Sequence, residues 1–329
     1  MKLFISGATG YIGHLLALEA ANNGYTVHAL VRDPASIYFP KHPNIIAFRG
    51  DILDEASVTA AMYGCDKVIH AAAIAKFCDK DASLFYQVNV EGTRKLLAAA
   101  LALKVKKFVY TSTGAVLGPS GKFPVSEGDP RLVAFENDYE ISKHWAEQVV
   151  KEYNRKGLFT VIVAAPRVYG PGPLTTGNPI TKLVQKVLNM GTGFVPSCRN
   201  IVANYAFVDD VVKGHFLAMD KGLGGEKYIL GGENISYLRF FDTIKACAGR
   251  KIKLIPVSLH LLKVWSYLHQ QVYRIAGNQT QISPRIITRL SQNRALSCDK
   301  ALRQLGYSIT PFSEGMRKTI HHLQNKTNA

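Results

Sequence analysis

The sequence predicts an α/β protein with a doubly wound parallel sheet in its first half and a smaller, mostly helical part after it. Two observations support this prediction: short apolar runs alternate with longer helical segments, and the alternation ends near Gly170-Pro171-Gly172-Pro173. Strands that alternate with helices of this length form βαβ units, which need a parallel sheet covered on both faces. A chain of 329 residues is long enough to bury both parts.

The expected strands are short apolar runs. They are Lys2–Ser6, Thr26–Val31, Ile45–Phe48, Lys67–His70, Lys107–Thr111 and Thr160–Ala164. The clearest helical segments between them are Tyr11–Asn23, Ser83–Leu103 and Asp138–Lys156. A late run, Lys227–Leu230, is expected to return to the sheet. We therefore divide the chain into a first domain of residues 1–165, joined by later segments around 203–231, and a second domain of residues 166–329.

A glycine-rich loop separates the first expected strand from the first expected helix. Glycines in this place let the backbone approach a pyrophosphate, which rests on the helix N-terminus. The arrangement is typical of a Rossmann-type nucleotide-binding domain, although the spacing is GxxGxxG and not GxGxxG. The loop residues expected to bind the cofactor are Gly7, Thr9, Gly10, Tyr11, Ile12 and Gly13.

The end of the second expected strand indicates which cofactor is bound. Val31 stands where an acidic residue would bind the ribose hydroxyl of NAD, and Arg32 follows it. A guanidinium suits the 2′-phosphate of NADP, so we expect NADP(H) in preference to NAD(H). Asp33 could instead pair with Arg32 or repel the phosphate. Asp51 and Ile52, after the third strand, are expected to flank the adenine.

Tyr139 and Lys143 form a YxxxK motif at the start of a helix, one turn apart on the same face. A free phenol has a pKa of about 10 and is a poor acid–base catalyst at neutral pH. A neighbouring ammonium group lowers that pKa, and the same lysine could hold the nicotinamide ribose. The motif gains weight from its position, after the glycine loop and after a strand that ends in Thr111-Ser112-Thr113.

In these motifs the chain resembles the extended short-chain dehydrogenase/reductases of the NAD-dependent epimerase/dehydratase superfamily. The resemblance is strongest to the dihydroflavonol 4-reductase-like and 3β-hydroxysteroid dehydrogenase-like branch. It covers essentially the whole chain. It rests on GATGYIG (7–13), VRDP (31–34), GDILD (50–54), VIHAAA (68–73), NVEGT (89–93), FVYTSTGAV (108–116), YEISK (139–143), APRVYGPG (165–172) and FVDDV (207–211).

The resemblance implies a role for each matched residue. Thr113 would hydrogen-bond the substrate carbonyl, with Ser112 as the fallback, Tyr139 would donate the proton, and Lys143 would tune Tyr139 and bind ribose. The positions expected to support or line the cofactor site are Asn89, Ala71, Ala72, Pro166 and Val168. Most members have serine where Thr113 stands, and the extra methyl group narrows the site.

The function implied is an NADPH-dependent reductase that transfers a hydride to a carbonyl of a hydrophobic or lipid-like small molecule. A hydroxysteroid-type dehydrogenase and a nucleotide-sugar epimerase or dehydratase are the enzymatic alternatives. Residues 201–210 lack the arginine that usually binds nucleotide-sugar phosphates, and Arg199 is out of register. An NADP-sensing regulator would have no need of Thr113, Tyr139 and Lys143 together.

The charge of the chain is uneven. Lys and Arg outnumber Asp and Glu by 18 to 16 in residues 1–164, but by 22 to 8 in 165–329 and by 15 to 3 in 234–329. The basic part is therefore a candidate surface for an anionic membrane or an anionic carrier, with solvated lysines as the alternative. Residues 258–276 are apolar and aromatic but too interrupted to span a bilayer. They could lie in a membrane interface, cap an apolar pocket or pack in the core.

The remaining features exclude several classes. No nucleic-acid-binding motif accompanies the basic charge, so no nucleic acid is expected as a partner. The five cysteines are odd in number and include no CxxC, which predicts neither a metal site nor a disulfide framework. Without a signal-peptide pattern after Met1, we expect a cytoplasmic protein, with peripheral membrane contact and a homodimer as further candidates.

Overall fold

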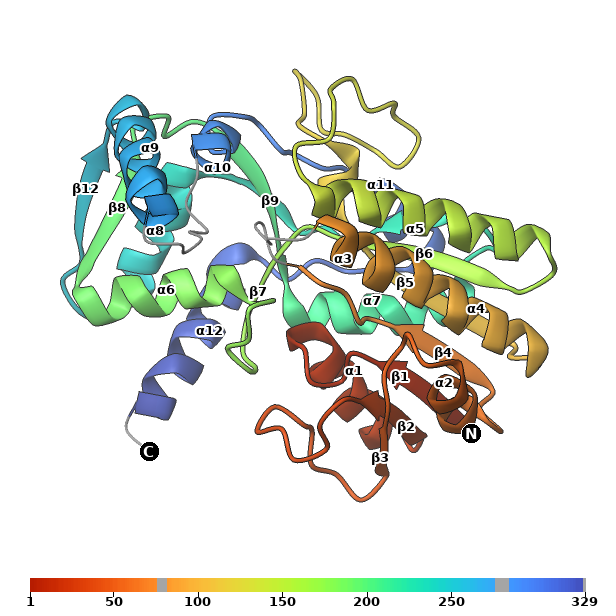
Figure 1. Cartoon of the computed structure of the whole chain (residues 1–329). Helices are drawn as coiled ribbons and strands as arrows, with labels where there is room; N and C mark the ends of the chain where they lie inside the picture. Colours follow the sequence, from red (N-terminus) through yellow and green to blue (C-terminus); the bar gives the residue numbers. More distant parts are fainter. Residues whose placement is uncertain (76–81, 276–283, 328–329) are drawn as a thin grey trace.

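The computed structural model describes residues 1–75, 82–275 and 284–327 and contains a seven-stranded parallel sheet (Figure 1). The strand order is β10-β6-β5-β4-β1-β2-β3. In chain order these strands are β1 (Lys2–Ser6), β2 (Thr26–Val31), β3 (Ile45–Arg49), β4 (Lys67–His70), β5 (Lys107–Thr113), β6 (Thr160–Ala165) and β10 (Lys227–Ile229). The predicted doubly wound α/β architecture is confirmed.

The predicted strands are confirmed with small differences at their ends. β1, β2 and β4 have the predicted bounds, and β5 runs two residues further, to Thr113. The late run returns to the sheet, where Tyr228 pairs with Val163 of β6. Division of the chain at residue 165 stays a prediction, because Lys227–Ile229 and the later helix α11 (Asp299–Leu305) also pack on this sheet.

Helices cover both faces of the sheet. One face carries α1 (Tyr11–Asn22), α7 (Val208–Lys221) and α11, and the other carries α2 (Glu55–Met62), α4 (Gly92–Ala102) and α5 (Asp138–Arg155). Successive strand residues alternate between these two cores: Leu3 and Ile5 face α1, whereas Phe4 faces the opposite layer. Both faces are apolar because side chains of a buried parallel strand meet helices on each side.

The segment predicted as one helix at Ser83–Leu103 is interrupted. It consists of α3 (Ala82–Tyr86), a π-helical turn at Gln87–Glu91, and α4. The π turn contains Asn89, which is 1% exposed and bonds to backbone and side chains outside its own helix. Single π turns of this kind occur where a helix is adapted to a functional site.

The second part of the chain adds short strands to the expected helices. A three-stranded sheet has the order β11-β9-β7, and β12 pairs with β8. The strands are β7 (Arg167–Tyr169), β8 (Thr192–Pro196), β9 (Val202–Phe207), β11 (Glu233–Ser236) and β12 (Lys253–Val257). The helices are α6 (Pro179–Met190), α8 (Tyr237–Cys247), α9 (Leu259–Ile275), α10 (Pro284–Arg289) and α12 (Phe312–Thr327). Tyr205, Phe240 and Phe312 stack at the centre of this part.

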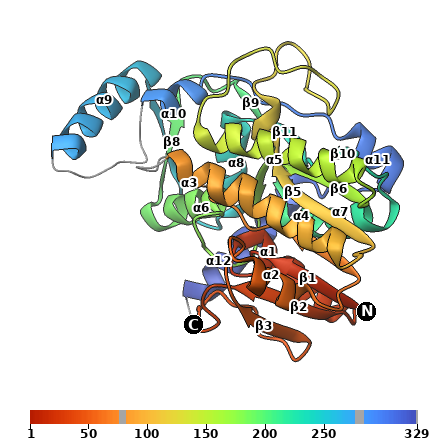
Figure 2. The same ribbon diagram turned by 45° about the vertical axis from the view of Figure 1, so that its right-hand side comes forward.

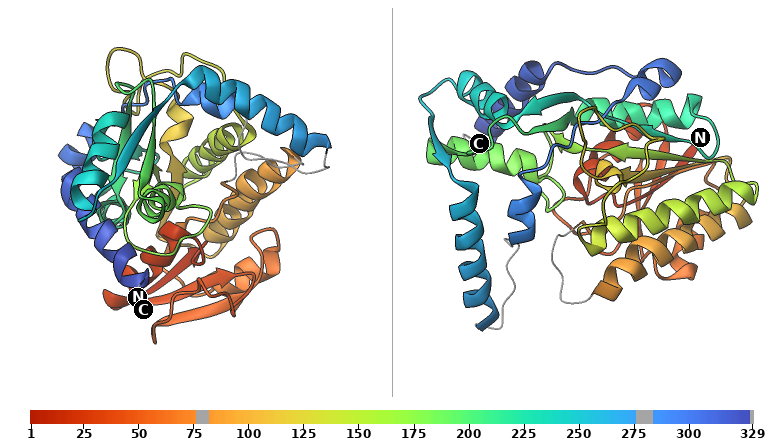
Figure 3. Two further views of the ribbon diagram at one scale, coloured as in Figure 1. Left: turned by 90° about the vertical axis from the view of Figure 1, so that its left-hand side faces the viewer. Right: turned by 90° about the horizontal axis from the view of Figure 1, so that it is seen from above.

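Helix α9 projects from the body of the molecule, with α10 beside its base (Figures 2 and 3). Its outer residues include several large apolar side chains that are about half exposed. In the ranges that the structure describes, no helix combines the length and the apolar character needed to cross a membrane.

Two histidines are buried in the sheet region without charge. His70 Nε2 lies 2.9 Å from the Thr93 hydroxyl, which itself donates to the Asn89 carbonyl. Nε2 therefore carries the proton, and Nδ1 accepts from the Ser6 hydroxyl at 2.7 Å. Burial lowers the pKa of His70 to about 3, and burial likewise lowers the pKa of His215 to about 4.

These two histidines predict a loss of stability in mild acid. Both remain neutral in the folded state, whereas in the unfolded chain a histidine binds a proton near pH 6.5. Stability is therefore highest above that pH and falls as the pH drops from about 6.5 towards 4. At about pH 5 each histidine should cost about 2 kcal/mol of unfolding free energy.

Urea unfolding at about pH 7.5 and pH 5 measures this loss. In His70→Gln the difference between the two pH values should shrink by about 2 kcal/mol, whereas His260→Gln, at an exposed position, should leave it unchanged. An equal acid loss in wild type and His70→Gln would contradict the assignment.

Candidate active site

The residues singled out from the sequence gather at one edge of the large sheet. Gly7 follows β1, Arg32 follows β2, Ala71 follows β4, Thr113 ends β5 and Pro166 follows β6. All neighbouring strands are parallel, so their carboxyl ends meet at this edge. Successive strands extend in opposite directions from the boundary between β1 and β4, which makes it the topological switch point, where ligands of open α/β sheets bind.

The glycine loop is packed through its backbone. Gly7 has a φ of +84°, and a Cβ there would lie 2.6 Å from the Ala72 nitrogen. A Cβ on Gly13 would lie 2.1 Å from the Gly7 carbonyl oxygen. Both positions therefore exclude a side chain, and α1 can start directly against β1. This close approach fits the pyrophosphate of a dinucleotide, which needs backbone N–H groups without side chains in front of them.

The N-terminus of α1 has no compensating negative charge. Gly10 is its cap residue, no side chain caps it, and its first turn contains no acidic residue. In contrast, the Asp54 carboxylate caps α2 by accepting from two backbone N–H groups. An uncompensated helix start favours an anion. Thr9 and Ile12 are partly exposed here, whereas Tyr11 is 2% exposed and donates to the Gly170 carbonyl, so Tyr11 can meet a cofactor only through its backbone.

Arg32 is exposed at the end of β2 and, among the described residues, makes no ion pair. The Asp33 carboxylate instead accepts from the Ala35 N–H at 3.0 Å. In the described part of the chain, Asp33 therefore does not form the ion pair with Arg32 that the sequence left open. Asp51 is half-buried and accepts from the Leu53 N–H, while Ile52 is buried against Gly92 of α4.

Asn89 joins the loop after β4 to the helix that carries the YxxxK motif. Its Oδ1 accepts from the Ile74 N–H at 2.8 Å, and its Nδ2 donates to the Ile74 carbonyl and, at 2.9 Å, to the Ser142 hydroxyl. Ser142 lies next to Lys143 on α5. The asparagine amide therefore fixes both walls of the crevice at once.

The Tyr139 phenol lies beside Thr113. Burial raises the pKa of Tyr139 above its ordinary value, and a hydrogen bond with the Thr113 hydroxyl and the positive charge of Arg289 partly offset this increase. The Thr113 hydroxyl also accepts from the Ala115 N–H at 3.2 Å, which holds it at the end of β5. The two hydroxyl groups thus face the same point at the carboxyl edge of the sheet.

Lys143 lies one helical turn from Tyr139 and is held by contacts of its own. Its Nζ donates to the Thr111 carbonyl at 2.7 Å and lies 4.2 Å from the centre of the Tyr110 ring. Burial lowers the pKa of Lys143 itself to about 7, and the Glu147 carboxylate opposes this shift. Burial is the largest influence on the Tyr139 pKa and raises it, opposite to the lowering expected from a neighbouring ammonium group, and the tuning of Tyr139 by Lys143 stays a prediction.

Ser112, the fallback for Thr113, points to the other side of β5. Its hydroxyl donates to Glu147 Oε1 at 2.6 Å, and Glu147 also pairs with Lys227 of β10. This arrangement leaves Thr113 as the hydroxyl beside Tyr139. It also ties the edge strand β10 to the helix that carries Tyr139.

A buried ion network surrounds the start of α5. Glu140 is fully buried and pairs with Arg131, at 2.7 Å, and with Arg289. Glu136 pairs with Arg289 at 3.1 Å and with Arg294 at 2.6 Å. Arg131 also donates to the two carbonyl groups of residues 115 and 116, just after Thr113. The network was not predicted from the sequence, since its members come from segments about 150 residues apart.

Pro166 and Val168 flank a residue that the sequence did not single out. Pro166 is half-buried beside Gly114, and Val168 is buried in the core under α1. Arg167 lies between them on β7, and its guanidinium contacts Tyr205 and Tyr237. An arginine in an otherwise apolar stretch next to Pro166 was the available signal.

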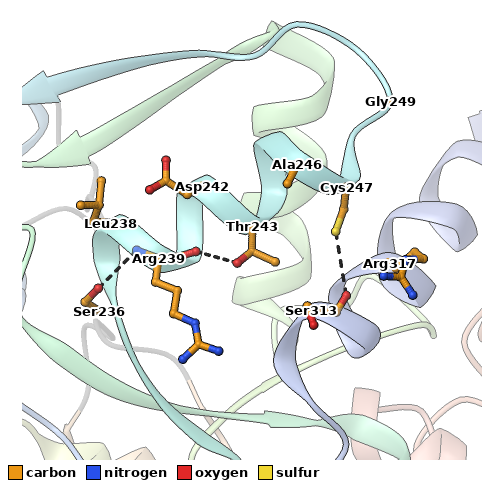
Figure 4. Close-up of a pocket in the computed structure, with 10 residues that line it drawn as sticks. All are labelled: Ser236, Leu238, Arg239, Asp242, Thr243, Ala246, Cys247, Gly249, Ser313 and Arg317. Carbon is orange, nitrogen blue, oxygen red and sulfur yellow. Dashed lines mark hydrogen bonds between the residues drawn. The ribbon is translucent and has the colours of Figure 1, made fainter.

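A separate hollow of about 720 Å³ lies between α8 and α12 (Figure 4). It is lined by Ser236, Leu238, Arg239, Asp242, Thr243, Ala246, Cys247, Gly249, Ser313 and Arg317. None of the predicted site residues lines it. The candidate catalytic residues lie at the carboxyl edge of the large sheet, so this hollow is separate from the candidate active site.

Comparison with known proteins identifies the family to which the chain belongs. Residues 3–231 match the model of the NAD dependent epimerase/dehydratase family. A Synechocystis protein provisionally named a dihydroflavonol 4-reductase is 28% identical, over 98% of this chain and 94% of its own length. A Mycolicibacterium neoaurum 3-beta-hydroxysteroid dehydrogenase is 27% identical, over 93% of this chain and 86% of its own. A third relative, from Stigmatella aurantiaca, is named a 4-hydroxy-2-methyl-3-oxo-4-farnesyl-3,4-dihydroquinoline-1-oxide ketoreductase. It is 28% identical, over 94% of this chain and 92% of its own length.

Two solved structures share the fold along their whole length. The crystal structure of gox2253 has a TM-score of 0.80 and 30% identity, and covers 98% of each chain. The Thermotoga maritima UDP-glucose 4-epimerase has the same TM-score, with 21% identity over 99% of this chain and 100% of its own. At that identity the epimerase supports the fold alone.

Proposed function

This chain belongs to the NAD dependent epimerase/dehydratase family, and on that premise we propose that it is an NADPH-dependent reductase of a carbonyl group on a bulky, largely apolar small molecule. The family is one of NAD(P)-dependent oxidoreductases that act on CH–OH and C=O groups. The observation that carries the proposal is the Tyr139 phenol, which hydrogen-bonds with the Thr113 hydroxyl at the carboxyl edge of the sheet.

We propose a role for each polar group. When bound, NADPH supplies the hydride. The phenol of Tyr139 is protonated at neutral pH because burial raises its pKa, so it can donate a proton to the carbonyl oxygen as negative charge develops there. Thr113 donates a hydrogen bond to the same oxygen. Lys143 is held by the Thr111 carbonyl one turn from Tyr139, and its ammonium group would donate to a hydroxyl of the nicotinamide ribose.

The cofactor preference rests on the two ends of the dinucleotide site. The glycine loop and the start of α1 fit the pyrophosphate, and Arg32 offers an exposed guanidinium where a 2′-phosphate would lie. No acidic residue occupies position 31, so the ribose hydroxyls of NAD would lack their usual carboxylate partner. These features favour NADP(H).

The preference for an apolar substrate draws on the relatives and on the sequence. The Stigmatella relative is named for a 3-oxo group on a farnesylated ring, and the Mycolicibacterium relative for a hydroxysteroid. Residues 201–210 lack the arginine that the nucleotide-sugar branch usually carries. A hydroxysteroid-type dehydrogenase, which runs the same chemistry in the oxidative direction, is the second candidate.

We also propose that α9 contacts an anionic membrane surface. Leu261, Trp265, Leu268 and Val272 lie on one helical face and are 48–65% exposed. The surrounding residues 234–329 carry twelve more basic than acidic groups. An apolar helical face within a basic region matches an interfacial helix, and it would give a membrane-dissolved substrate a short route to the enzyme.

Replacing the phenol tests the mechanism. Tyr139→Phe should lower kcat for NADPH-dependent reduction of carbonyl substrates by about 10²- to 10⁴-fold, the usual contribution of a general acid. NADPH oxidation is followed by absorbance over a panel of steroid, quinone and flavonoid ketones. Tyr63→Phe, at a 73% exposed position, is the matched control. Equal turnover by Tyr139→Phe and wild type would exclude this mechanism, and conversion of UDP-glucose without net NADPH oxidation would favour an epimerase.

Removing the guanidinium tests the cofactor preference. Arg32→Ala should raise the Kd for NADPH about 10- to 100-fold, because a charge-assisted hydrogen bond to the phosphate is lost, and should leave the Kd for NADH nearly unchanged. Fluorescence titration measures both values, with Arg303→Ala on α11 as the control. The preference is refuted if wild type binds NADH at least as tightly as NADPH.

Vesicle sedimentation tests the membrane contact. The protein should pellet with vesicles of phosphatidylcholine and phosphatidylglycerol but not with phosphatidylcholine alone, and added salt should release it. Leu268→Asp should reduce the bound fraction roughly tenfold, whereas Leu223→Asp should not, although both leucines are 58% exposed. Salt-insensitive or absent sedimentation would remove the proposal.

A further inference from the structure

Arg167 occupies a position beside the proposed reaction centre that the mechanism above does not use. Ala165 of β6 pairs with Thr113 on the neighbouring strand β5. Arg167 lies two residues after Ala165, at the start of β7. Val168 turns into the core under α1. Because side chains alternate along a strand, Arg167 leaves β7 on the opposite side, towards Tyr205 and Tyr237.

The surroundings of Arg167 are aromatic and lack a counter-ion. Its Nη1 donates to the Tyr205 hydroxyl at 3.3 Å, and the guanidinium carbon lies 5.6 Å and 5.8 Å from the ring centres of Tyr205 and Tyr237. Within the described ranges, no carboxylate pairs with Arg167. The two phenols favour the charged form of Arg167 and raise its pKa despite burial, but neither phenol neutralises its positive charge.

A second arginine with unused donors lies near it. Arg294 is 8% exposed, and its Nη2 donates to Glu136 and Gln292. Its Nε and Nη1 are buried and have no hydrogen-bond partner among the described residues. The Arg167 and Arg289 charges both act on Arg294 and, with burial, lower its pKa to about 10, so it remains charged at neutral pH.

Backbone contacts place Arg294 at the same site. Its own N–H and carbonyl bond to β9, where Tyr205 also lies, through the Val202 carbonyl and the Asn204 N–H. Two residues later, Leu296 packs against Gly114, where a Cβ would lie 2.7 Å from its Cδ1. Gly114 directly follows Thr113. The segment that carries Arg294 therefore runs between β9 and the turn that presents the Thr113 hydroxyl.

The charges in this region do not balance. Among the residues that the structure describes here, four arginines, at 131, 167, 289 and 294, lie near two carboxylates, those of Glu136 and Glu140. The surplus is two positive charges in a largely buried region. Buried polar donors are normally satisfied, so orphaned guanidinium nitrogens beside a reaction centre indicate a ligand that supplies the acceptors.

We propose that Arg167 and Arg294 form an anion-binding subsite that holds a carboxylate of the substrate while Tyr139 and Thr113 face its carbonyl group. The substrate class is then an apolar oxo acid. The planar guanidinium groups and the rings of Tyr205 and Tyr237 fit a planar, singly charged carboxylate. This inference rests on the reductase proposal and adds a specificity to it.

The test compares matched substrates that differ only in charge. NADPH-dependent reduction is measured for a series of oxo fatty acids, with the ketone and the carboxyl group separated by different chain lengths, and for their methyl esters. For at least one length the acid should have a kcat/KM about 10- to 100-fold above its ester, the usual effect of charge-assisted hydrogen bonds. Arg167→Gln should reduce this acid/ester ratio at least tenfold, and Arg199→Gln, an exposed arginine, should leave it unchanged.

A binding measurement separates this inference from the proposed reaction. With NADPH-saturated protein, hexanoate should raise the thermal unfolding midpoint more than hexanamide at equal concentration, and Arg167→Gln should abolish the difference. If no ketone is reduced but hexanoate stabilises selectively, the reductase proposal fails and the subsite stands. If esters react as well as acids, and hexanoate and hexanamide act alike, the subsite is refuted.

Arg167→Lys is a second, conservative variant that keeps the test valid if Arg167→Gln fails to fold. It keeps the positive charge but loses the planar fork, so it should retain part of the acid/ester ratio. A purely structural arginine would change Tm in both variants and leave the ratio at its wild-type value, which would also overturn the proposal.

Discussion

The close backbone contact between Gly7, Gly13 and Ala72 is the constraint on which the rest of the site depends. Three segments, the loop after β1, the first turn of α1 and the loop after β4, meet there with no side chain between them. This contact fixes the N-terminus of α1 at the point where the strand order diverges. Tyr11, in the same turn, donates to the Gly170 carbonyl and so connects the second part of the chain to the glycine loop.

Ion pairs position the start of helix α5, which carries Tyr139, together with apolar packing. A fully buried carboxylate, Glu140, directly follows Tyr139 and is neutralised by Arg131, nine residues before it, and by Arg289, from a distant segment. Removing one partner of such a network leaves a buried charge without compensation, which is far more costly than losing a surface pair. The position of the phenol therefore depends on Arg131 and Arg289, although neither is part of the motif that identifies the site.

Much of the fold could be predicted because strand and helix periodicities are local. The seven strands of the large sheet were found within two residues at each end, and the glycine loop has the backbone geometry that its spacing indicates. The π turn at Gln87–Glu91 was missed, because it depends on Asn89 bonding to Ile74 and Ser142. The direction of the Tyr139 pKa shift was also missed, since burial cannot be read from a four-residue spacing.

The return of late residues to the first sheet has a consequence for how the chain is made. Until Lys227–Ile229 leave the ribosome, β6 is an open strand edge, and Ala301, Leu305 and Tyr307 complete the core under it later still. An open apolar edge is a template for pairing with other chains. The large sheet therefore stays incomplete until most of the chain has been synthesised, and its folding cannot finish on the ribosome from the first half of the chain alone.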